Sequence, residues 1–175
     1  LDNDGVGEII YMSFRDAAEA GNGINVWEWD GVVGSDNYIQ YVIPIMVDGV
    51  EVDRYYGERT LNVGDPDSDG QQELLIANNG NSGATYDILM IAHVDGTFES
   101  GFYSLVSEWE SNKDAPEWGG SPGYGQANVT DLDGDGDKEV CFFSWNNNTI
   151  IVVEALGTDD YAIQSATMID SSGND

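Results

Sequence analysis

The chain has 175 residues, of which 33 are Asp or Glu and only 5 are Lys or Arg, so the formal net charge is −28. Phosphate binding requires clusters of Lys and Arg, so this balance argues against nucleic-acid binding and against binding to an anionic membrane surface. Hydrophobic residues make up 41% of the chain, and no apolar run reaches the roughly 18 residues of a membrane helix. We therefore expect a folded protein without membrane insertion.

Short β-strands are the predicted elements along the whole chain. Runs rich in Ile, Val, Tyr and Trp are bounded by Gly, Asn and Asp, which is typical of strands. Helical periodicity is sustained nowhere, although residues 15–20 suit one helical turn or a hairpin loop. In chain order, the predicted strands cover residues 8–14, 24–29, 38–47, 60–63, 73–77, 86–93, 102–109, 126–129, 139–144, 149–154 and 161–168. The sequence therefore predicts an all-β fold.

One acidic motif occurs three times between these strands. Residues 131–140 read DLDGDGDKEV, residues 65–74 read DPDSDGQQEL, and residues 1–9 read LDNDGVGEI. All three fit D-x-D-x-D-G-x-x-E followed by an aliphatic residue, except that the first copy lacks its opening Asp. In chain order we name these segments loop 1 (residues 1–8), loop 2 (residues 65–73) and loop 3 (residues 131–139).

The spacing of the carboxylates predicts a calcium site in each loop. Ca²⁺ takes 6–8 oxygen ligands at about 2.3–2.6 Å, and alternate side chains of a tight loop can turn toward one ion. Glycine at the sixth position permits the turn, the seventh residue offers its backbone carbonyl, and the ninth-position glutamate completes the shell. The predicted ligands are Asp2, Asp4, Val6 and Glu8 in a partial first site, Asp65, Asp67, Asp69, Gln71 and Glu73 in the second, and Asp131, Asp133, Asp135, Asp137 and Glu139 in the third.

Other interpretations of the motif fit less well. An acidic turn without a metal would leave four carboxylates repelling one another within ten residues, and three copies in register argue against it. An EF-hand loop has twelve residues between two helices, whereas strand-forming residues flank these loops. Magnesium retains its waters and rarely occupies an all-protein cage.

The loops recur at a period that indicates a repeat architecture. Asp2, Asp67 and Asp133 stand 65 and 66 residues apart. Four strands per repeat is the content of one propeller blade, which divides the chain into residues 1–63, 64–129 and 130–175. These units amount to about 2.7 blades, whereas a closed propeller has at least four. Because a blade buries its faces against its neighbours, we expect further blades of the same chain or self-association with other copies to cover the remaining faces.

The tandem motif at this period resembles the FG-GAP/VCBS repeats of integrin-α-type propellers and of many secreted bacterial proteins, and the resemblance covers essentially the whole chain. Residues 26–31 (VWEWDG) and 153–157 (VEALG) are similar to the second strand of the bacterial repeats. The resemblance implies a calcium-binding β-propeller, extracellular or at the cell surface, with ligands at the positions named above. It implies a structural, adhesive or assembly role, with a cell-surface protein or a polysaccharide as a candidate ligand. Two features depart from the family: the Phe-Gly/Gly-Ala-Pro signature is absent, and the ninth position is Glu where the family often has Asp.

No catalytic constellation is visible, so we predict that the protein is not an enzyme. His93 is the only histidine and lacks a partner motif for nucleophilic catalysis. One alternative is the propeller part of a polysaccharide lyase, which would need a cation to neutralise a uronate. Another is a carbohydrate-binding module whose tryptophans stack on sugars. We expect Trp27 and Trp29 to pack in the core or between blades, whereas Trp118, in a Gly/Pro-rich loop, suits a surface.

Overall fold

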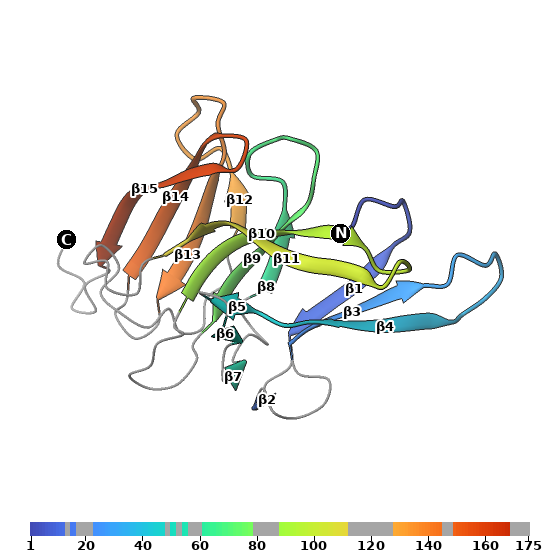
Figure 1. Cartoon of the computed structure of the whole chain (residues 1–175). Helices are drawn as coiled ribbons and strands as arrows, with labels where there is room; N and C mark the ends of the chain where they lie inside the picture. The colour runs from blue at the N-terminus through green and yellow to red at the C-terminus, as the bar shows by residue number, and fades with distance from the viewer. Residues whose placement is uncertain are drawn as a thin grey trace.

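The computed structural model describes residues 1–12, 15–16, 23–47, 50–51, 54–55, 61–78, 88–111, 128–144 and 149–168. Every regular element in these ranges is a β-strand, which confirms the all-β prediction. None of the described segments is a helix long and apolar enough to cross a membrane. Most of the strands belong to three antiparallel sheets, which follow one another in chain order across the molecule (Figure 1).

Sheet 1 contains the strands that follow loop 1. Its order is β1 (Glu8–Met12), β3 (Ile24–Trp29) and β4 (Tyr38–Ile43). The β1–β3 register places Glu8 opposite Glu28. Two small ladders accompany this sheet, one between β2 (Arg15–Asp16) and β7 (Arg54–Tyr55) and one between β5 (Met46–Val47) and β6 (Val50–Glu51).

Sheets 2 and 3 are four-stranded meanders, each with an acidic loop between its first two strands. Sheet 2 runs from β8 (Leu61–Gly64) through β9 (Glu73–Asn78) and β10 (Ile88–Thr97) to β11 (Phe102–Glu110). Sheet 3 runs from β12 (Asn128–Thr130) through β13 (Glu139–Ser144) and β14 (Thr149–Gly157) to β15 (Asp160–Met168). The pairing of β8 with β9 places Leu61–Gly64 in sheet 2, together with the strands that follow loop 2, although the sequence division assigned residues 61–63 to the first unit.

Two hydrophobic clusters form the core, and sheet 2 contributes to both. Side chains alternate between the faces of a strand, so Leu74 and Ile76 of β9 pack with sheet 1, whereas Leu75 and Ala77 pack with sheet 3. All four are fully buried, because sheet 2 is covered on both faces. The continuous apolar run that follows Glu73 is typical of a strand in that position.

Aromatic side chains pack across both sheet boundaries. Tyr41 of sheet 1 stacks on Phe98 of sheet 2 with ring centroids 5.0 Å apart, and Trp109 of sheet 2 stacks on Phe142 of sheet 3 at 6.2 Å. Trp109 thus packs between sheets, and Trp27 and Trp29 are half-buried in β3. Trp118 and Trp145 lie outside the described residues.

Some predicted strand limits were wrong, and the causes are local. The predicted strand 38–47 is interrupted at Pro44, which cannot donate to a ladder, and so divides into β4 and β5. The predicted strands 86–93 and 149–154 extend further, to Thr97 and Gly157, because each continues into a hairpin with the next strand. Residues 15–16 form a short strand where a helical turn or hairpin loop was expected. The predicted strand positions 13–14, 60, 86–87 and 126–127 lie outside the described residues.

Candidate metal centres

The three acidic loops share one backbone conformation. In every copy the fourth and sixth residues have a positive φ, a region that favours glycine and tolerates asparagine better than most other residues. The φ values are 62° at Asn3, 62° at Ser68 and 85° at Gly134 for the fourth position, and 89° at Gly5, 94° at Gly70 and 106° at Gly136 for the sixth. The motif therefore specifies the same turn three times.

Aspartate side chains hold this turn through backbone hydrogen bonds. The seventh residue donates its N–H to Oδ1 of the fifth-position aspartate, at 2.7 Å from Val6 to Asp4, 2.7 Å from Gln71 to Asp69 and 2.9 Å from Asp137 to Asp135. The fifth residue donates in the same way to the third-position aspartate, at 3.4 Å in loop 1 and 3.2 Å in loops 2 and 3. These contacts do not test the backbone carbonyls of the seventh residues, whose role as ligands stays a prediction.

Three of the predicted side-chain ligands come together in each loop. The ligand oxygens of Asp65, Asp67 and Glu73 lie within 4.8 Å of one another, and the same holds for Asp131, Asp133 and Asp135. In loop 1, the group consists of Asp2, Asp4, Glu8 and an unpredicted fourth member, Glu28 of β3. Asp69 lies in an overlapping group with Asp67 and Asp159. Oxygens on opposite sides of a Ca²⁺ ion are about 5 Å apart, so these groups have the right size for one ion each.

The closing glutamate of each loop has a buried oxygen that no group in the described residues satisfies. Glu73 and Glu139 are 1% and 0% exposed, and the Glu8 side chain is 10% exposed. Oε1 of Glu8, Oε2 of Glu73 and Oε1 of Glu139 have no hydrogen-bond partner among the described residues. A buried carboxylate oxygen without a partner is costly, and a cation in the loop would remove that cost. The three loops therefore fit a hard divalent cation.

The other oxygen of the closing glutamate accepts a hydrogen bond in loops 1 and 3 that loop 2 cannot form. The terminal amino group of Leu1 donates to Oε2 of Glu8 at 2.8 Å, and the backbone N–H of Leu132 donates to Oε2 of Glu139. The corresponding second position of loop 2 is Pro66, which has no N–H to donate. Glu73 therefore lacks the bond that the other two closing glutamates receive.

Burial and neighbouring carboxylates raise the pKa of several of these acids. Burial first, and then the charge of Glu108, raises the pKa of Glu73 from 4.5 to about 9. Burial, followed by the charge of Glu99, raises the pKa of Glu28 to about 7. Burial and the charge of Asp135 likewise raise the pKa of Glu154. A bound divalent cation would reverse this balance, because it stabilises the ionised carboxylates.

Loop 1 contacts sheet 2, and loop 2 contacts sheet 3. In each case, the residue two positions after the glycine of a hairpin turn donates its N–H to Oδ2 of the third-position aspartate. Phe98, after Gly96, donates to Asp2 at 2.9 Å, and Asp159, after Gly157, donates to Asp67 at 2.9 Å. The repeated geometry places the predicted sites of loops 1 and 2 at sheet boundaries.

Loop 2 has a second contact with sheet 3. Lys138, within loop 3, donates from Nζ to the backbone oxygen of Asp65 at 2.6 Å. Its ammonium charge therefore lies at the start of an acidic loop that belongs to the neighbouring sheet.

Two β-bulges aim side chains at the loops. In sheet 2, Ile91 pairs with Trp109 and Ala92 with Ser107, which leaves Glu108 as the extra residue. In sheet 3, the corresponding bulge leaves Gln164 unpaired in the ladder, and its Nε2 donates to Oδ2 of Asp133 at 3.3 Å. A bulge redirects the side chain of its extra residue.

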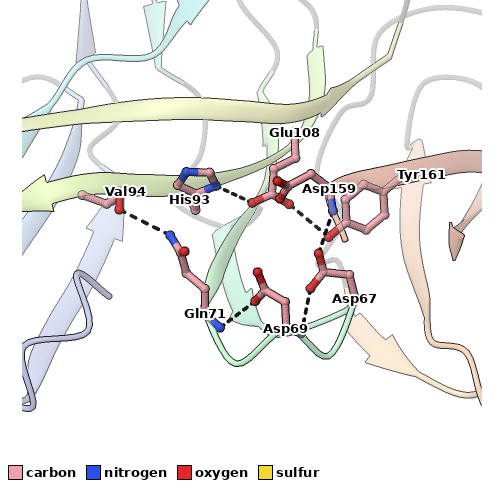
Figure 2. A network of polar contacts seen from close by, with 8 residues as sticks. All are labelled: Asp67, Asp69, Gln71, His93, Val94, Glu108, Asp159 and Tyr161. Atoms are coloured by element: carbon pink, nitrogen blue, oxygen red, sulfur yellow. Dashed lines mark hydrogen bonds and ion pairs between the residues drawn. The ribbon is translucent and has the colours of Figure 1, made fainter. Parts of the chain in front are cut away.

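Glu108 is the centre of a polar network over loop 2 (Figure 2). Its Oε1 lies 2.6 Å from Nδ1 of His93, and its Oε2 accepts a 3.0 Å bond from the Tyr161 hydroxyl of sheet 3. Burial raises the pKa of Glu108, an effect that the bonds from His93 and Tyr161 oppose. His93, Glu108 and Asp159 have ligand atoms within 4.8 Å of one another.

The residues that sequence reasoning missed come from outside the motif. Glu28, Glu108 and Asp159 join the loops only because strands and hairpins separated in sequence lie together. One signal was available: residues 26–31 (VWEWDG), 91–96 (IAHVDG) and 152–157 (VVEALG) align, and the alignment places Glu28, His93 and Glu154 at one position. A comparison of the chain with known protein families, characterised proteins and solved structures found no match.

Proposed function

We propose that this chain is an extracellular calcium-binding repeat protein in which the ions rigidify the loops and join neighbouring β-propeller blades. The observation that carries the proposal is the buried oxygen on the closing glutamate of all three loops, which has no hydrogen-bond partner in the described part of the chain. A motif that served only as a turn would have no need to bury a carboxylate at its ninth position three times.

Calcium supplies what the protein groups lack. Each loop gathers several carboxylates, and the chain as a whole has a net charge of −28. One ion at 100 times its dissociation constant stabilises the folded state by about 2.7 kcal/mol, and three such ions together contribute about 8 kcal/mol. That sum is of the same order as the whole stability of a typical domain, so folding would depend on calcium.

The position of the loops supports a structural role. Loops 1 and 2 each accept a hydrogen bond from the hairpin of the following sheet, so an ion that fixes the aspartates also fixes the acceptor. Packing of sheet 2 on both faces supports a blade arrangement in which each sheet covers its neighbour. Further blades of the same chain, or self-association of copies, would continue that packing, and the resulting surface would serve adhesion or assembly.

The test is calorimetric titration with Ca²⁺ and Mg²⁺, combined with thermal unfolding in calcium and in chelator. We expect calcium to bind at loops 1, 2 and 3 and to raise the melting temperature, with magnesium much less effective. A chain whose melting temperature is the same in calcium and in chelator would contradict the proposal.

Sedimentation velocity under the same two conditions tests assembly separately. Large species in calcium that dissociate in chelator are expected if copies pack through their outer sheets. A monomer in calcium would contradict self-association and leave the calcium-binding role intact.

A further inference from the structure

Glu28 is a buried acid outside the motif that points into the ligand group of loop 1. It is 1% exposed, and its Oε2 has no hydrogen-bond partner among the described residues. Its ligand oxygen lies within 4.8 Å of those of Asp2, Asp4 and Glu8. The residue belongs to β3, and the antiparallel register places it directly opposite Glu8. Two carboxylate oxygens without a partner in the described ranges, one on Glu8 and one on Glu28, therefore share one buried site.

The same strand position recurs beside the other two loops. In sheet 3, the register places Glu154 opposite the closing Glu139. In sheet 2, Leu74 pairs with Ala92, and extending this register by one residue places His93 opposite Glu73. The residue opposite the closing glutamate is thus a glutamate in two sheets and, in the third, a histidine by extension of the register.

We propose that the residue opposite the closing glutamate (Glu28, His93 or Glu154) is an additional ligand of the cation in each loop. We further propose that its side chain sets which class of cation the loop accepts. Glu28 and Glu154 give loops 1 and 3 an oxygen-only shell, which suits Ca²⁺. His93 is connected to loop 2 through Asp159, which shares a group with Asp67 and Asp69, and its nitrogen would allow loop 2 to bind a borderline cation such as Zn²⁺ in addition to Ca²⁺. The proposal rests on cation binding by the loops, as put forward above.

The surroundings of His93 support the distinction. Its ring nitrogen lies with the carboxylates of Glu108 and Asp159 in one potential ligand group, and Asp159 links this group to Asp67 and Asp69 of loop 2. Tyr161 holds the second oxygen of Glu108, as outer hydrogen bonds commonly do for a metal-binding carboxylate. A nitrogen ligand with flanking carboxylates is a donor set that loops 1 and 3 lack among their described neighbours.

The first experiment measures calcium binding to loop 1 alone, in a chain carrying Asp69→Asn and Asp135→Asn to weaken loops 2 and 3. Adding Glu28→Gln should weaken calcium binding about tenfold, the scale expected from losing one charged ligand. In chelator, Glu28→Gln should melt at the same temperature as its parent or higher, because a buried charge has been removed. Glu110→Gln, at an exposed position in β11, is the matched control and should change neither value.

Unchanged calcium affinity in Glu28→Gln would overturn the ligand role of Glu28. Glu28→Asp gives a second measurement: it keeps the charge but withdraws it by one methylene, so intermediate affinity is expected. A parent chain that gains no stability from calcium would instead refute the proposed function, so the two failures are distinguishable.

The second experiment uses His93 as its own reporter, because the chain has only one histidine. Zinc should shift the His93 ring signals in the NMR spectrum of the intact chain. His93→Glu should bind zinc at least about tenfold more weakly and calcium more tightly, since it recreates the donor set of loops 1 and 3. Ring signals that zinc leaves unmoved, or equal zinc affinity in wild type and His93→Glu, would overturn the proposed cation preference of loop 2.

Discussion

Loops 2 and 3 carry almost the same motif but occupy different surroundings. Loop 2 is covered by sheet 3: Asp67 accepts from Asp159, and the backbone oxygen of Asp65 accepts from Lys138. In loop 3, the aspartates at the first, third and fifth positions are exposed, and the contact to Asp133 comes from Gln164 within its own sheet. The motif specifies the local turn in both places, whereas the neighbouring sheet decides how far the carboxylates are buried.

The residue that precedes each motif differs in size in line with this difference in burial. The residue before loop 2 is Gly64, and a Cβ added there would lie 2.7 Å from Cγ2 of Val129 in sheet 3. The residue before loop 3 is Thr130, which is exposed. The residue before loop 2 must therefore be small, because sheet 3 packs against the start of that loop.

The largest expected effect comes from disabling one loop at a time. In calcium, Asp69→Asn should lower the free energy of unfolding by about 3 kcal/mol, the contribution of one well-occupied ion. Asp135→Asn should cost less, because the aspartates of loop 3 contact only their own loop and sheet among the described residues. Chemical denaturation in calcium measures both, and denaturation in chelator is the control, where the two variants should match wild type. A larger loss of unfolding free energy in Asp135→Asn than in Asp69→Asn would contradict the greater structural contribution of loop 2.

The second effect is on pH dependence. The folded-state pKa of Glu73 is raised from 4.5 to about 9, so in metal-free protein its contribution to stability is complete below about pH 4.5 and is lost as the pH rises toward 9. Calcium requires the carboxylate, so binding at loop 2 should release a proton and tighten up to about tenfold per pH unit between about pH 6 and pH 8. Calorimetry in buffers of different ionisation enthalpy measures the proton release.

Pro66→Ala sharpens this prediction. The substitution restores an N–H at the position from which Leu132 bonds to Glu139. A bond to the ionised Glu73 would lower its pKa, so the variant should release less of a proton on binding calcium than wild type does at the same pH. An equal proton release would show that the missing N–H does not explain the raised pKa.

The third prediction exchanges the flanking residues. Gly64→Thr should destabilise the protein by about 1–3 kcal/mol through overpacking against Val129. Val129→Ala should recover part of that loss when combined with it, which a double-mutant cycle measures. The reciprocal change, Thr130→Gly, should have a smaller effect. Additive single-variant effects would place the cause of the destabilisation elsewhere.

The smallest expected effect concerns Lys138. Lys138→Met keeps the length of the side chain but removes its bond to the Asp65 backbone oxygen, so we expect a loss of about 1–2 kcal/mol. The loss should be greater in chelator than in calcium, because the ammonium charge offsets loop carboxylates that an ion would otherwise neutralise. Thermal unfolding of Lys138→Met under both conditions gives the answer, and an equal loss in each would contradict the electrostatic explanation.

The parts of the fold that depend on local sequence could be predicted. The three turns follow from alternate aspartates with glycine at the sixth position, and strands such as residues 24–29 and 139–144 were predicted at their observed limits. Pro44, which has no N–H to donate to a ladder, marks the end of β4 in the sequence. The strand order within each sheet also follows from short connections between neighbours.

The rest of the candidate site depends on register and packing, which local patterns do not encode. Glu28 joins loop 1 because β1 and β3 pair across about 20 residues, and one residue of slippage would place it on the other face. Glu108 reaches His93 from the extra residue of a bulge, and nothing in the sequence around it marks that irregularity. Asp159 contacts Asp67 from a different sheet altogether.

The hairpin contact that repeats between sheets has an implication for how such a molecule could arise. Sheet 2 carries both halves of the contact: Phe98 donates to the loop behind it, and Asp67 accepts from the hairpin ahead. A gene segment that encodes one such unit already encodes both the hairpin that donates the hydrogen bond and the loop that accepts it. Duplicating that segment in tandem lengthens the protein without requiring a new interface, so the number of units can change during evolution while each junction stays the same.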